Sequence, residues 1–384
     1  MSAPGTTRAF TPVLEGAAAA AALDAAERIA SSLPAEGPPD LAGGCAGFAV
    51  AHAALHRLRP DRGHDLRALE AISAAAARIS SEPLRAGLWD GVCGVAWAAT
   101  YLEKCGLLEE EDDPAAEIDA GLADALSRGW TRSMDVVTGL AGVIAYLVER
   151  LPRPAAVGAL PLALQRLEEA ASGADGGLLW RTPAADLAAD ERARSPEGAS
   201  FLGVAHGAAG IAAAAARALA AGVDVERGRR LVRGAASAIL AHQGPPAIAG
   251  QPEPARGSWC HGAPATAAAL LSAARALDDA GVAERARAIA SAAAAAGLEA
   301  PGVSDDGGLC HGPAGAAHLH ARLYQHTGDE ASLIAGRRWM KRALEVAPPE
   351  APGLLQGRAG HALAIAAAAA AVEPDWDRPL LLVL

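Results

Sequence analysis

Two kinds of helical stretch alternate along the chain, and a short glycine motif stands between them. Stretches made almost entirely of alanine and other apolar residues follow the motif, for example at residues 95–104, 143–150, 211–220 and 264–279. Stretches with more charge on one side stand before it, for example at residues 18–31, 116–127, 225–242, 282–296 and 331–346. A helix that is apolar all round is usually buried, whereas a helix with a polar face meets solvent. The pattern therefore predicts pairs that each contain an inner and an outer helix.

The glycine motif, G-x-x-G or close to it, occurs seven times. Its first glycines are Gly44, Gly91, Gly139, Gly207, Gly262, Gly312 and Gly357, and the intervals between them are 47, 48, 68, 55, 50 and 45 residues. Each interval can hold two helices and their connections. Seven pairs predict an all-α (α/α)₇ toroid of two concentric rings of seven helices. The repeats alone also permit a solenoid, but the terminal repeats lack polar caps, which favours a closed ring.

The repeats predict one domain preceded by a short arm. Residues 18–384 form the predicted toroid, and residues 1–17 are predicted to be a flexible arm. Loops are expected at residues 152–154, 172–198 and 244–257. The second of these loops accounts for the longest interval between the glycine motifs.

Composition and charge agree with a helical protein and exclude some partners. The chain is 52% hydrophobic and rich in alanine, the strongest helix former, but has only 3 Phe and 3 Tyr. Its 33 basic and 44 acidic residues give a net charge of −11, which argues against nucleic-acid binding. No apolar run is long enough to span a membrane. Five cysteines, an odd number, and the lack of a secretion signal indicate a reduced, cytoplasmic protein.

Two Cys-His-Gly tripeptides carry the strongest chemical signal, because cysteine and histidine are preferred zinc ligands. They end at Gly262 and Gly312. The residues directly before the first glycines of the seven repeats are Gly43, Asp90, Thr138, His206, His261, His311 and Gln356. Helix capping explains Asp90 and Thr138 but not the histidines. Because the inner helices of a toroid start at one end, this column would surround one mouth. The histidines would then be neighbours of Cys260 and Cys310 in a metal-centred pocket.

Five segments together resemble the lanthionine synthetase C-like family, the cyclases of lanthipeptide biosynthesis. They are residues 87–94 (GLWDGVCG), 205–210 (AHGAAG), 258–262 (SWCHG), 309–315 (LCHGPAG) and 356–360 (QGRAG). The resemblance runs from about residue 18 to the C-terminus. It implies a zinc enzyme that adds peptide cysteine thiols to dehydroalanine or dehydrobutyrine and so closes thioether rings. It also implies one Zn²⁺ per chain, with Cys260, Cys310 and His311 as ligands.

The same resemblance implies three catalytic residues, His206, Asp135 and Arg256. We expect His206 to transfer protons, Asp135 to orient it and Arg256 to stabilise a developing oxyanion or hold the substrate carbonyl. At the position of His261 the family pattern leads us to expect tyrosine, so His261 either lines the substrate cavity or closes the zinc site as a fourth ligand.

Two further residues, Trp259 and Gln356, are expected in the substrate pocket. Core packing is an equally good account of Trp259. A neighbouring tryptophan, Trp89, flanks another motif and is open to the same two interpretations.

The expected partner is a dehydrated precursor peptide, and all seven repeats are used by the toroid, so a separate dehydratase must supply it. An export complex is a further candidate partner, and attachment to such a membrane-bound complex stays open.

Two other functions remain possible: addition of glutathione or another free thiol, and a non-catalytic zinc-stabilised scaffold that carries peptides. A prenyltransferase-like enzyme is disfavoured by the scarcity of Phe and Tyr, and a glycan-cleaving barrel by the single acid, Asp90, in the column.

Overall fold

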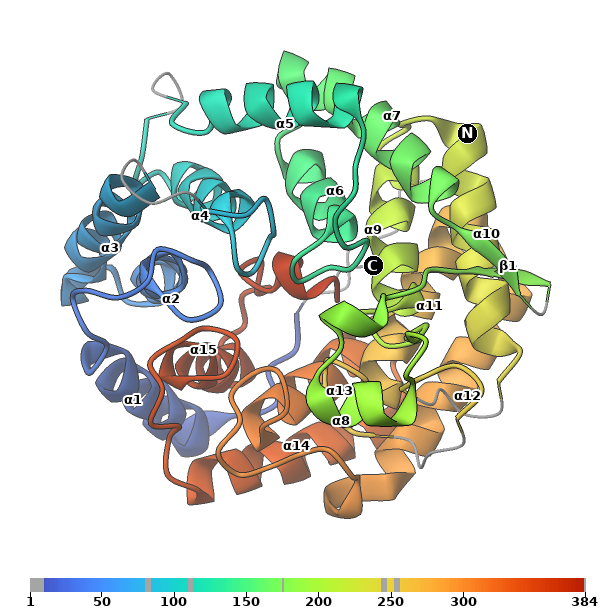
Figure 1. Ribbon diagram of the computed structural model, residues 1–384. Helices are drawn as coiled ribbons and strands as arrows, with labels where there is room; N and C mark the ends of the chain where they lie inside the picture. Colours follow the sequence, from blue (N-terminus) through green and yellow to red (C-terminus); the bar gives the residue numbers. More distant parts are fainter. Residues whose placement is uncertain are drawn as a thin grey trace, which may run out of the picture.

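Seven inner helices form a closed ring in the computed structural model, which describes residues 10–79, 84–109, 113–174, 176–242, 247–251 and 256–382. They are α2 (Cys45–Leu58), α4 (Val92–Lys104), α6 (Leu140–Glu149), α9 (Ala208–Ala220), α11 (Ala263–Leu277), α13 (Pro313–Thr327) and α15 (Arg358–Ala369). Each inner helix contacts the next, and α15 contacts α2 (Figure 1). The predicted closed toroid is therefore confirmed, and a solenoid is excluded.

Seven outer helices surround this ring (Figure 1). They are α1 (Gly16–Ser31), α3 (His64–Ile79), α5 (Ala116–Arg128), α7 (Pro154–Glu169), α10 (Val225–Leu240), α12 (Ala280–Ala296) and α14 (Glu330–Glu345). The division predicted from charge is observed, because every residue of α9 up to Leu219 is buried whereas only three residues of α12 are. In the described part of the chain, no helix is both long and apolar enough for a membrane crossing.

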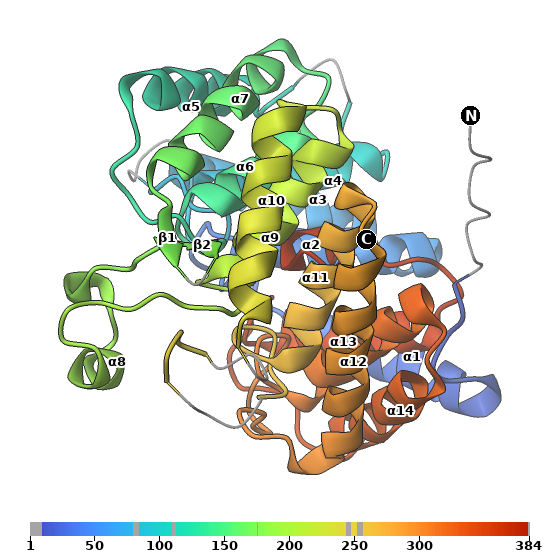
Figure 2. The same ribbon diagram turned by 90° about the vertical axis from the view of Figure 1, so that its right-hand side faces the viewer.

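The segment expected to be a loop at residues 172–198 contains ordered elements. The strands β1 (Ser172–Ala174) and β2 (Gly177–Leu179) pair in antiparallel register, and the 3₁₀ turn η3 (Ala184–Asp186) and the helix α8 (Ala189–Arg194) follow. The part with α8 projects from the body (Figure 2). We call residues 172–198 the insertion. It is anchored at its end by two backbone hydrogen bonds between Thr182 and Ala199, of 2.7 and 3.0 Å.

A separate small apolar cluster packs the insertion against neighbouring segments of the chain. It consists of Leu187, Ala199, Phe201, Ala247 and Ile248, all buried and apart from the main core. Of the loop expected at residues 152–154, Pro154 is instead the first residue of α7, and residues 150–153 join α6 to α7. Of the loop expected at residues 244–257, the described residues 247–251 and 256–257 contain no helix, and residues 244–246 and 252–255 lie outside the described residues.

The first glycine of every repeat is the residue just before an inner helix. Its backbone is extended, so the glycine is needed for space and not for a left-handed conformation. A Cβ atom on Gly44 would lie under 3.0 Å from the backbone oxygen of Pro38, and a Cβ on Gly207 would lie under 3.0 Å from the backbone oxygen of Phe201. Such distances are essentially never seen for real Cβ atoms. The glycine motif therefore marks the places where the chain folds back against its own backbone.

A closed belt of backbone hydrogen bonds joins the seven entry loops around one mouth of the toroid. The donor and acceptor pairs are Ala42 N to Trp89 O, Trp89 N to Val137 O, Val136 N to Ala205 O, Ala205 N to Cys260 O, Trp259 N to Cys310 O, Cys310 N to Leu355 O and Leu355 N to Ala42 O, at 2.7 to 3.1 Å. We call these residues the backbone belt. It returns to its start, so all seven repeats are held at one level, including the two cysteines of the tripeptides.

The C-terminal segment fills the centre of the ring (Figure 1). Its turn η5 (Arg378–Leu380) lies there, and the Leu380 carbonyl accepts a hydrogen bond of 2.9 Å from Nε1 of Trp259. The wholly buried Asp377 is paired with His318 and Arg322, at 2.8 and 3.1 Å. Burying a carboxylate is costly unless it is paired, so these contacts fix the segment in place.

Part of the predicted N-terminal arm is in contact with the toroid. The Leu14 N–H donates to the Ala368 carbonyl at 2.8 Å, the Thr11 N–H donates to Gln325, and Val13 is buried. The outer helix α1 begins at Gly16. Residues 1–9 of the arm lie outside the described residues.

Substituting an entry glycine should destabilise the toroid, whereas a glycine in an open helical position should not. We expect Gly44→Ala to lower the free energy of unfolding by roughly 1–3 kcal/mol, because its Cβ would overlap the Pro38 backbone. Gly158→Ala in α7, where a Cβ would meet nothing within 4 Å, should raise it by up to about 1 kcal/mol. Urea denaturation of both variants measures the difference. Equal effects would show that the close approach at Gly44 is unimportant.

Candidate functional site

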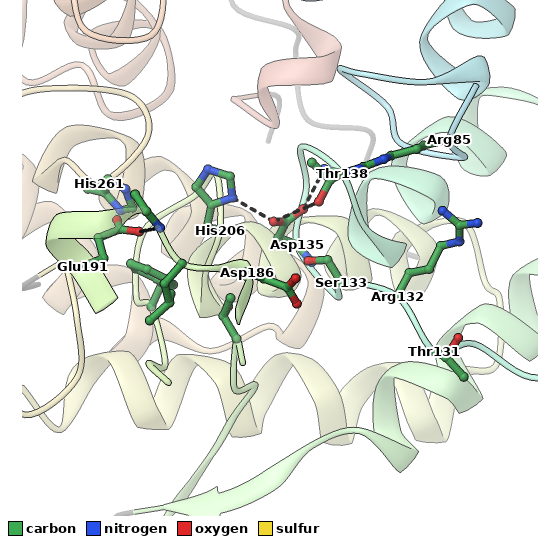
Figure 3. Close-up of a pocket in the computed structure, with 14 residues that line it drawn as sticks. Arg85, Thr131, Arg132, Ser133, Asp135, Thr138, Asp186, Glu191, His206 and His261 are labelled. Atoms are coloured by element: carbon green, nitrogen blue, oxygen red, sulfur yellow. Dashed lines mark hydrogen bonds and ion pairs between the residues drawn. The ribbon is translucent and has the colours of Figure 1, made fainter. Parts of the chain in front are cut away.

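A cavity of about 630 Å³ opens beside the backbone belt, over repeats two to five (Figure 3). Two positions of the repeat supply the wall formed by the toroid. Thr138, His206 and His261 come directly before a first glycine, and Arg85, Ser133 and Phe201 come six residues before one. The insertion supplies the opposite wall through Thr182, Asp186, Leu187, Ala188 and Glu191. The repeats therefore build one side of the cavity, and the single insertion builds the other.

His206 and Asp135 form a hydrogen-bonded pair in this cavity (Figure 3). The distance from His206 Nδ1 to Asp135 Oδ2 is 2.8 Å, and the other oxygen of Asp135 accepts hydrogen bonds from the backbone N–H and hydroxyl of Thr138, at 2.7 and 3.2 Å. The carboxyl group is thus fixed from three directions. The carboxylate needs a donor, so Nδ1 of His206 carries the proton. The second ring nitrogen, Nε2, is left for a ligand, and the side chain is 39% exposed.

The pair shifts both pKa values in favour of the charged forms. Burial disfavours the carboxylate of Asp135, but the hydrogen bond and charge of His206 outweigh it and hold the pKa of Asp135 below its usual value. Burial also disfavours the imidazolium of His206, yet the hydrogen bond and charge of Asp135 raise the pKa of His206. A raised pKa keeps a larger fraction of the His206 imidazole protonated near neutral pH, so more of the protein has a proton to donate.

Cys260 and Cys310 lie side by side on two neighbouring entry loops that the backbone belt joins. The hydrogen bond with Cys310 lowers the pKa of Cys260, and burial opposes this effect. The pKa of the Cys310 thiol, which is only 6% exposed, is raised by the same contact and by burial. The positive charge that His311 can carry also lowers the pKa of Cys260. One of the two thiols is therefore ionised readily, as a soft metal ion requires of its ligands.

The donor set at this place fits zinc in kind, since it consists of two neighbouring thiols and a nearby imidazole. In the described ranges of the chain, however, no three side chains of His, Cys, Asp or Glu are grouped closely enough to hold an ion. The predicted ligand set of Cys260, Cys310 and His311 thus remains a prediction. What the structure establishes is the adjacency of the two thiols.

His261 lies at one end of the cavity, next to His206 and Phe201. The ring centroids of His206 and His261 are 6.0 Å apart, and the Phe201 and His261 rings are 5.5 Å apart. Burial first, and the charges of His206 and Arg256 next, lower the pKa of His261 to about 3. Its imidazole is therefore neutral near pH 7. Nδ1 of His261 is buried and has no hydrogen-bond partner in the described structure.

Arg256 lies at the edge of this region, close to His261. Its backbone pairs with Gly262, and its side chain runs past Gly302, where a Cβ would be 3.3 Å from it. It does not line the cavity, but its charge is close enough to contribute to the lowered pKa of His261.

Two residues expected in the pocket lie elsewhere. Trp259 is 1% exposed, its Nε1 donates to Leu380, and its ring packs edge-on against Trp89 at 5.7 Å. Core packing is therefore the observed role of both tryptophans. The loop directs the Trp259 side chain into the core, and the Cys260 carbonyl accepts a hydrogen bond from the neighbouring loop. Gln356 is exposed at the mouth and does not line the cavity.

Several residues that line the cavity were not among those predicted from the sequence. Arg85 could have been found, because it stands six residues before Gly91, as Arg256 stands six residues before Gly262, and both form the same backbone bridge. Arg132 has no such repeat signal. The insertion residues Asp186 and Glu191 could not have been assigned, since nothing in the sequence indicates which side of the mouth the segment covers.

Comparisons with known proteins agree with this architecture. The family model described as lanthionine synthetase C-like protein matches residues 35–381. The solved structure of nisin cyclase is similar over 95% of this chain and 96% of its own, with a TM-score of 0.78 and 17% sequence identity. At that identity the likeness concerns the fold. None of the curated proteins matches the chain in sequence.

Removing the carboxylate of Asp135 should lower the pKa of His206. We expect the histidine pKa to fall in Asp135→Asn, since the hydrogen bond and charge that raise it are weakened. NMR titration of the His206 ring protons measures this. Asp186→Asn, which neutralises another acid in the cavity, serves as the control and should leave the His206 titration in place. An unchanged pKa in Asp135→Asn would contradict the assigned pairing.

The pair should also make stability depend on pH in a defined window. The contribution of Asp135, whose pKa is lowered, is present above its usual value of 3.8 and is lost as the pH falls through the lowered pKa. The contribution of His206, whose pKa is raised, is present below 6.5 and is lost as the pH rises through the raised pKa. The stability difference between the wild type and Asp135→Asn should therefore be largest between about pH 3.8 and 6.5. Denaturation at several pH values tests this.

Proposed function

The chain belongs to the lanthionine synthetase C-like family, and from this premise we propose that it is a zinc-dependent lanthipeptide cyclase. In this proposal it adds the cysteine thiols of a dehydrated peptide to dehydroalanine or dehydrobutyrine residues of the same peptide. The observation that carries the proposal is the juxtaposition of two adjacent thiols, Cys260 and Cys310, with the His206–Asp135 pair at one mouth of the toroid. Thiol chemistry and proton transfer would then take place in neighbouring repeats.

We propose that Cys260, Cys310 and His311 hold the zinc ion. The lowered pKa of Cys260 supports one thiolate ligand, the neighbouring position of Cys310 supplies a second sulfur, and His311 follows Cys310 directly in the chain. Zinc, when bound, keeps a coordinated thiol deprotonated near neutral pH, which makes the substrate sulfur nucleophilic. His261 is neutral and next to the cavity, and in this proposal it contacts the peptide and leaves the metal to the other three residues.

The reaction needs one proton to be moved and one negative charge to be stabilised. The substrate sulfur forms a bond to Cβ of the dehydroamino acid, the electrons of the double bond move to Cα and the adjacent carbonyl, and Cα then takes a proton. We propose that His206 donates this proton from Nε2 while Asp135 holds its Nδ1–H. The proton lost by the thiol restores the imidazolium. Arg256 is proposed to face the enolate oxygen.

The chemistry of the substrate defines the partners. A peptide that carries dehydroamino acids must come from a dehydratase, so we propose that a separate dehydratase acts before this protein. The exposed Gln356 at the mouth is a proposed contact for the incoming peptide. A cytoplasmic location, with handover of the product to an export complex, completes the proposal.

Zinc content tests the ligand set. We expect the purified protein to hold about one zinc ion per chain, and Cys260→Ala and Cys310→Ala each to lose most of it, because two thiolates supply the main attraction for the ion. Cys105→Ala, at the end of α4, is the matched control and should retain zinc. Metal analysis by mass spectrometry gives the result. Loss of zinc in His261→Ala would contradict the assignment of three protein ligands.

Cyclisation of a dehydrated peptide tests the reaction. Incubation of the zinc-loaded protein with a peptide that contains one cysteine and one dehydroalanine should protect the thiol from alkylation without a change in mass. His206→Ala should keep its zinc but slow ring closure by about 10²–10⁴-fold, the usual contribution of a positioned proton donor. Freely alkylatable thiols after incubation with the wild type would contradict the cyclase proposal.

The same assay separates the two alternative functions. A mass increase equal to one glutathione, when glutathione is added, would indicate addition of a free thiol. Tight binding of the peptide without any reaction would indicate a scaffold.

A further inference from the structure

The two ends of the cavity differ in chemistry (Figure 3). His206 and His261 lie toward one end, whereas Arg85 and Arg132 lie at the other, with Thr131 and Ser133 beside them. The function proposed above uses only the histidine end. The arginine end thus holds two cationic groups in the same cavity with no role in the reaction.

Arg85 reaches the cavity because of its place in the repeat. Its carbonyl accepts the N–H of Val92 at 2.8 Å, as the carbonyl of Arg256 accepts the N–H of Ala263 at 2.8 Å. Both residues also bridge to the glycine that begins the next inner helix. The fold therefore places an arginine at the same backbone position in repeats two and five, and of the two only the Arg85 side chain lines the cavity.

Arg85 and Arg132 form no ion pair within the described residues, and both side chains are exposed. The charge of Arg85 reaches the half-buried Asp90, where it opposes the rise in pKa that burial causes, but the two side chains are not hydrogen-bonded. Asp135 is occupied by His206 and Thr138, and Asp186 lines the cavity without pairing with either arginine. Most other arginines that face a pocket or a buried region, such as Arg150 and Arg322, are paired with acids. Two unpaired cations in one wall favour an anionic ligand.

We propose that Arg85 and Arg132 form a subsite for a carboxylate of the substrate peptide, either an aspartate or glutamate side chain or the C-terminal carboxyl group. The planar guanidinium fork matches a carboxylate with two parallel hydrogen bonds. The hydroxyl group of Thr131 lies on the same wall and can donate to the same anion, whereas the Ser133 side chain is hydrogen-bonded to Asp135. The inference rests on the proposed function, since it takes the ligand to be the peptide that is cyclised.

The subsite gives the peptide a direction in the cavity. A carboxylate held at the arginine end leaves the adjacent residues to extend past Asp135 toward His206, where the bond is formed. The chain as a whole carries a charge of −11, so an acidic peptide would otherwise be repelled. The arginine pair would thus determine which peptides enter productively and would act on binding more than on the chemical step.

A binding assay with unreactive peptides tests the subsite. The probe is a fluorescent peptide with one dehydroalanine, with serine in place of the cysteine so that no ring can close, with one aspartate and with a free C-terminus. One matched peptide has asparagine for the aspartate, a second has a C-terminal amide, and a third has both changes. Fluorescence anisotropy measures the affinity of each for the zinc-loaded wild type, for Arg85→Ala/Arg132→Ala and for Arg85→Lys/Arg132→Lys.

The arginine pair Arg229 and Arg233 provides the matched control. Both are exposed on the outer helix α10, four residues apart, and neither forms an ion pair in the described structure. Arg229→Ala/Arg233→Ala removes the same charge from the protein as the test variant does. Any effect of net charge alone would therefore appear equally in the control.

We expect the wild type to bind one of the two singly changed peptides, the asparagine peptide or the C-terminal amide, about tenfold more weakly than the acidic peptide. The change that weakens binding identifies which carboxylate the arginines hold. In Arg85→Ala/Arg132→Ala the acidic and neutral peptides should bind equally, the lysine variant should keep part of the preference, and the control should keep all of it. Equal binding of all peptides by the wild type, or tight binding of the acidic peptide by the alanine variant, would overturn the proposal, as would the absence of binding by every peptide.

The failure of the subsite can be told apart from the failure of the proposed function. Cyclisation of the cysteine-containing peptides at equal efficiency, with or without the carboxylates, would overturn the subsite alone. Charge-dependent binding without cyclisation of the cysteine-containing peptide would overturn the cyclase and leave the subsite standing.

Discussion

The backbone belt is the constraint on which the rest of this molecule depends. Each of its hydrogen bonds contributes only about 0.5–1.5 kcal/mol net, but a buried N–H or carbonyl left without a partner would cost about 1–3 kcal/mol. Because the belt closes on itself, no repeat can shift along the axis without breaking bonds on both sides. The entry glycines make it possible, since a Cβ at Gly44 would overlap the backbone that folds back against it. The belt converts a repeated sequence motif into a ring of fixed positions.

The chemistry follows from which residues occupy equivalent positions of this ring. Cys260 and Cys310 occupy one position in adjacent repeats, and the belt hydrogen bond from Trp259 to the Cys310 carbonyl brings their loops together. His206 occupies the next position in the preceding repeat and meets Asp135 across another junction of the belt. Arg85 and Arg256 occupy a third equivalent position, in repeats two and five. The insertion breaks the symmetry, because it covers only one part of the mouth and forms the second wall of the cavity there.

Much of this arrangement can be predicted from the sequence, for identifiable reasons. The glycine spacing and the alternation of apolar and charged stretches give the two rings, and alignment on Gly207 and Gly262 brings His206 next to the cysteines. The expected pairing of Asp135 with His206 is observed, although their catalytic roles remain proposals. The belt itself is invisible in the sequence, because backbone groups form it irrespective of side chain. For the same reason the inward turn of Trp259 could not be distinguished from an outward one, and the wall formed by the insertion could not be placed.

A crystal structure of the zinc-loaded protein, with anomalous diffraction data at the zinc edge, tests the proposed metal site most directly. We expect one strong peak per chain, about 2.3 Å from the sulfur atoms of both Cys260 and Cys310 and about 2.0–2.1 Å from a nitrogen of His311, with His261 unbound. A peak that lies away from the two cysteines, or one bonded to His261 as a fourth ligand, would contradict the claim that the belt assembles an open thiol-binding metal site.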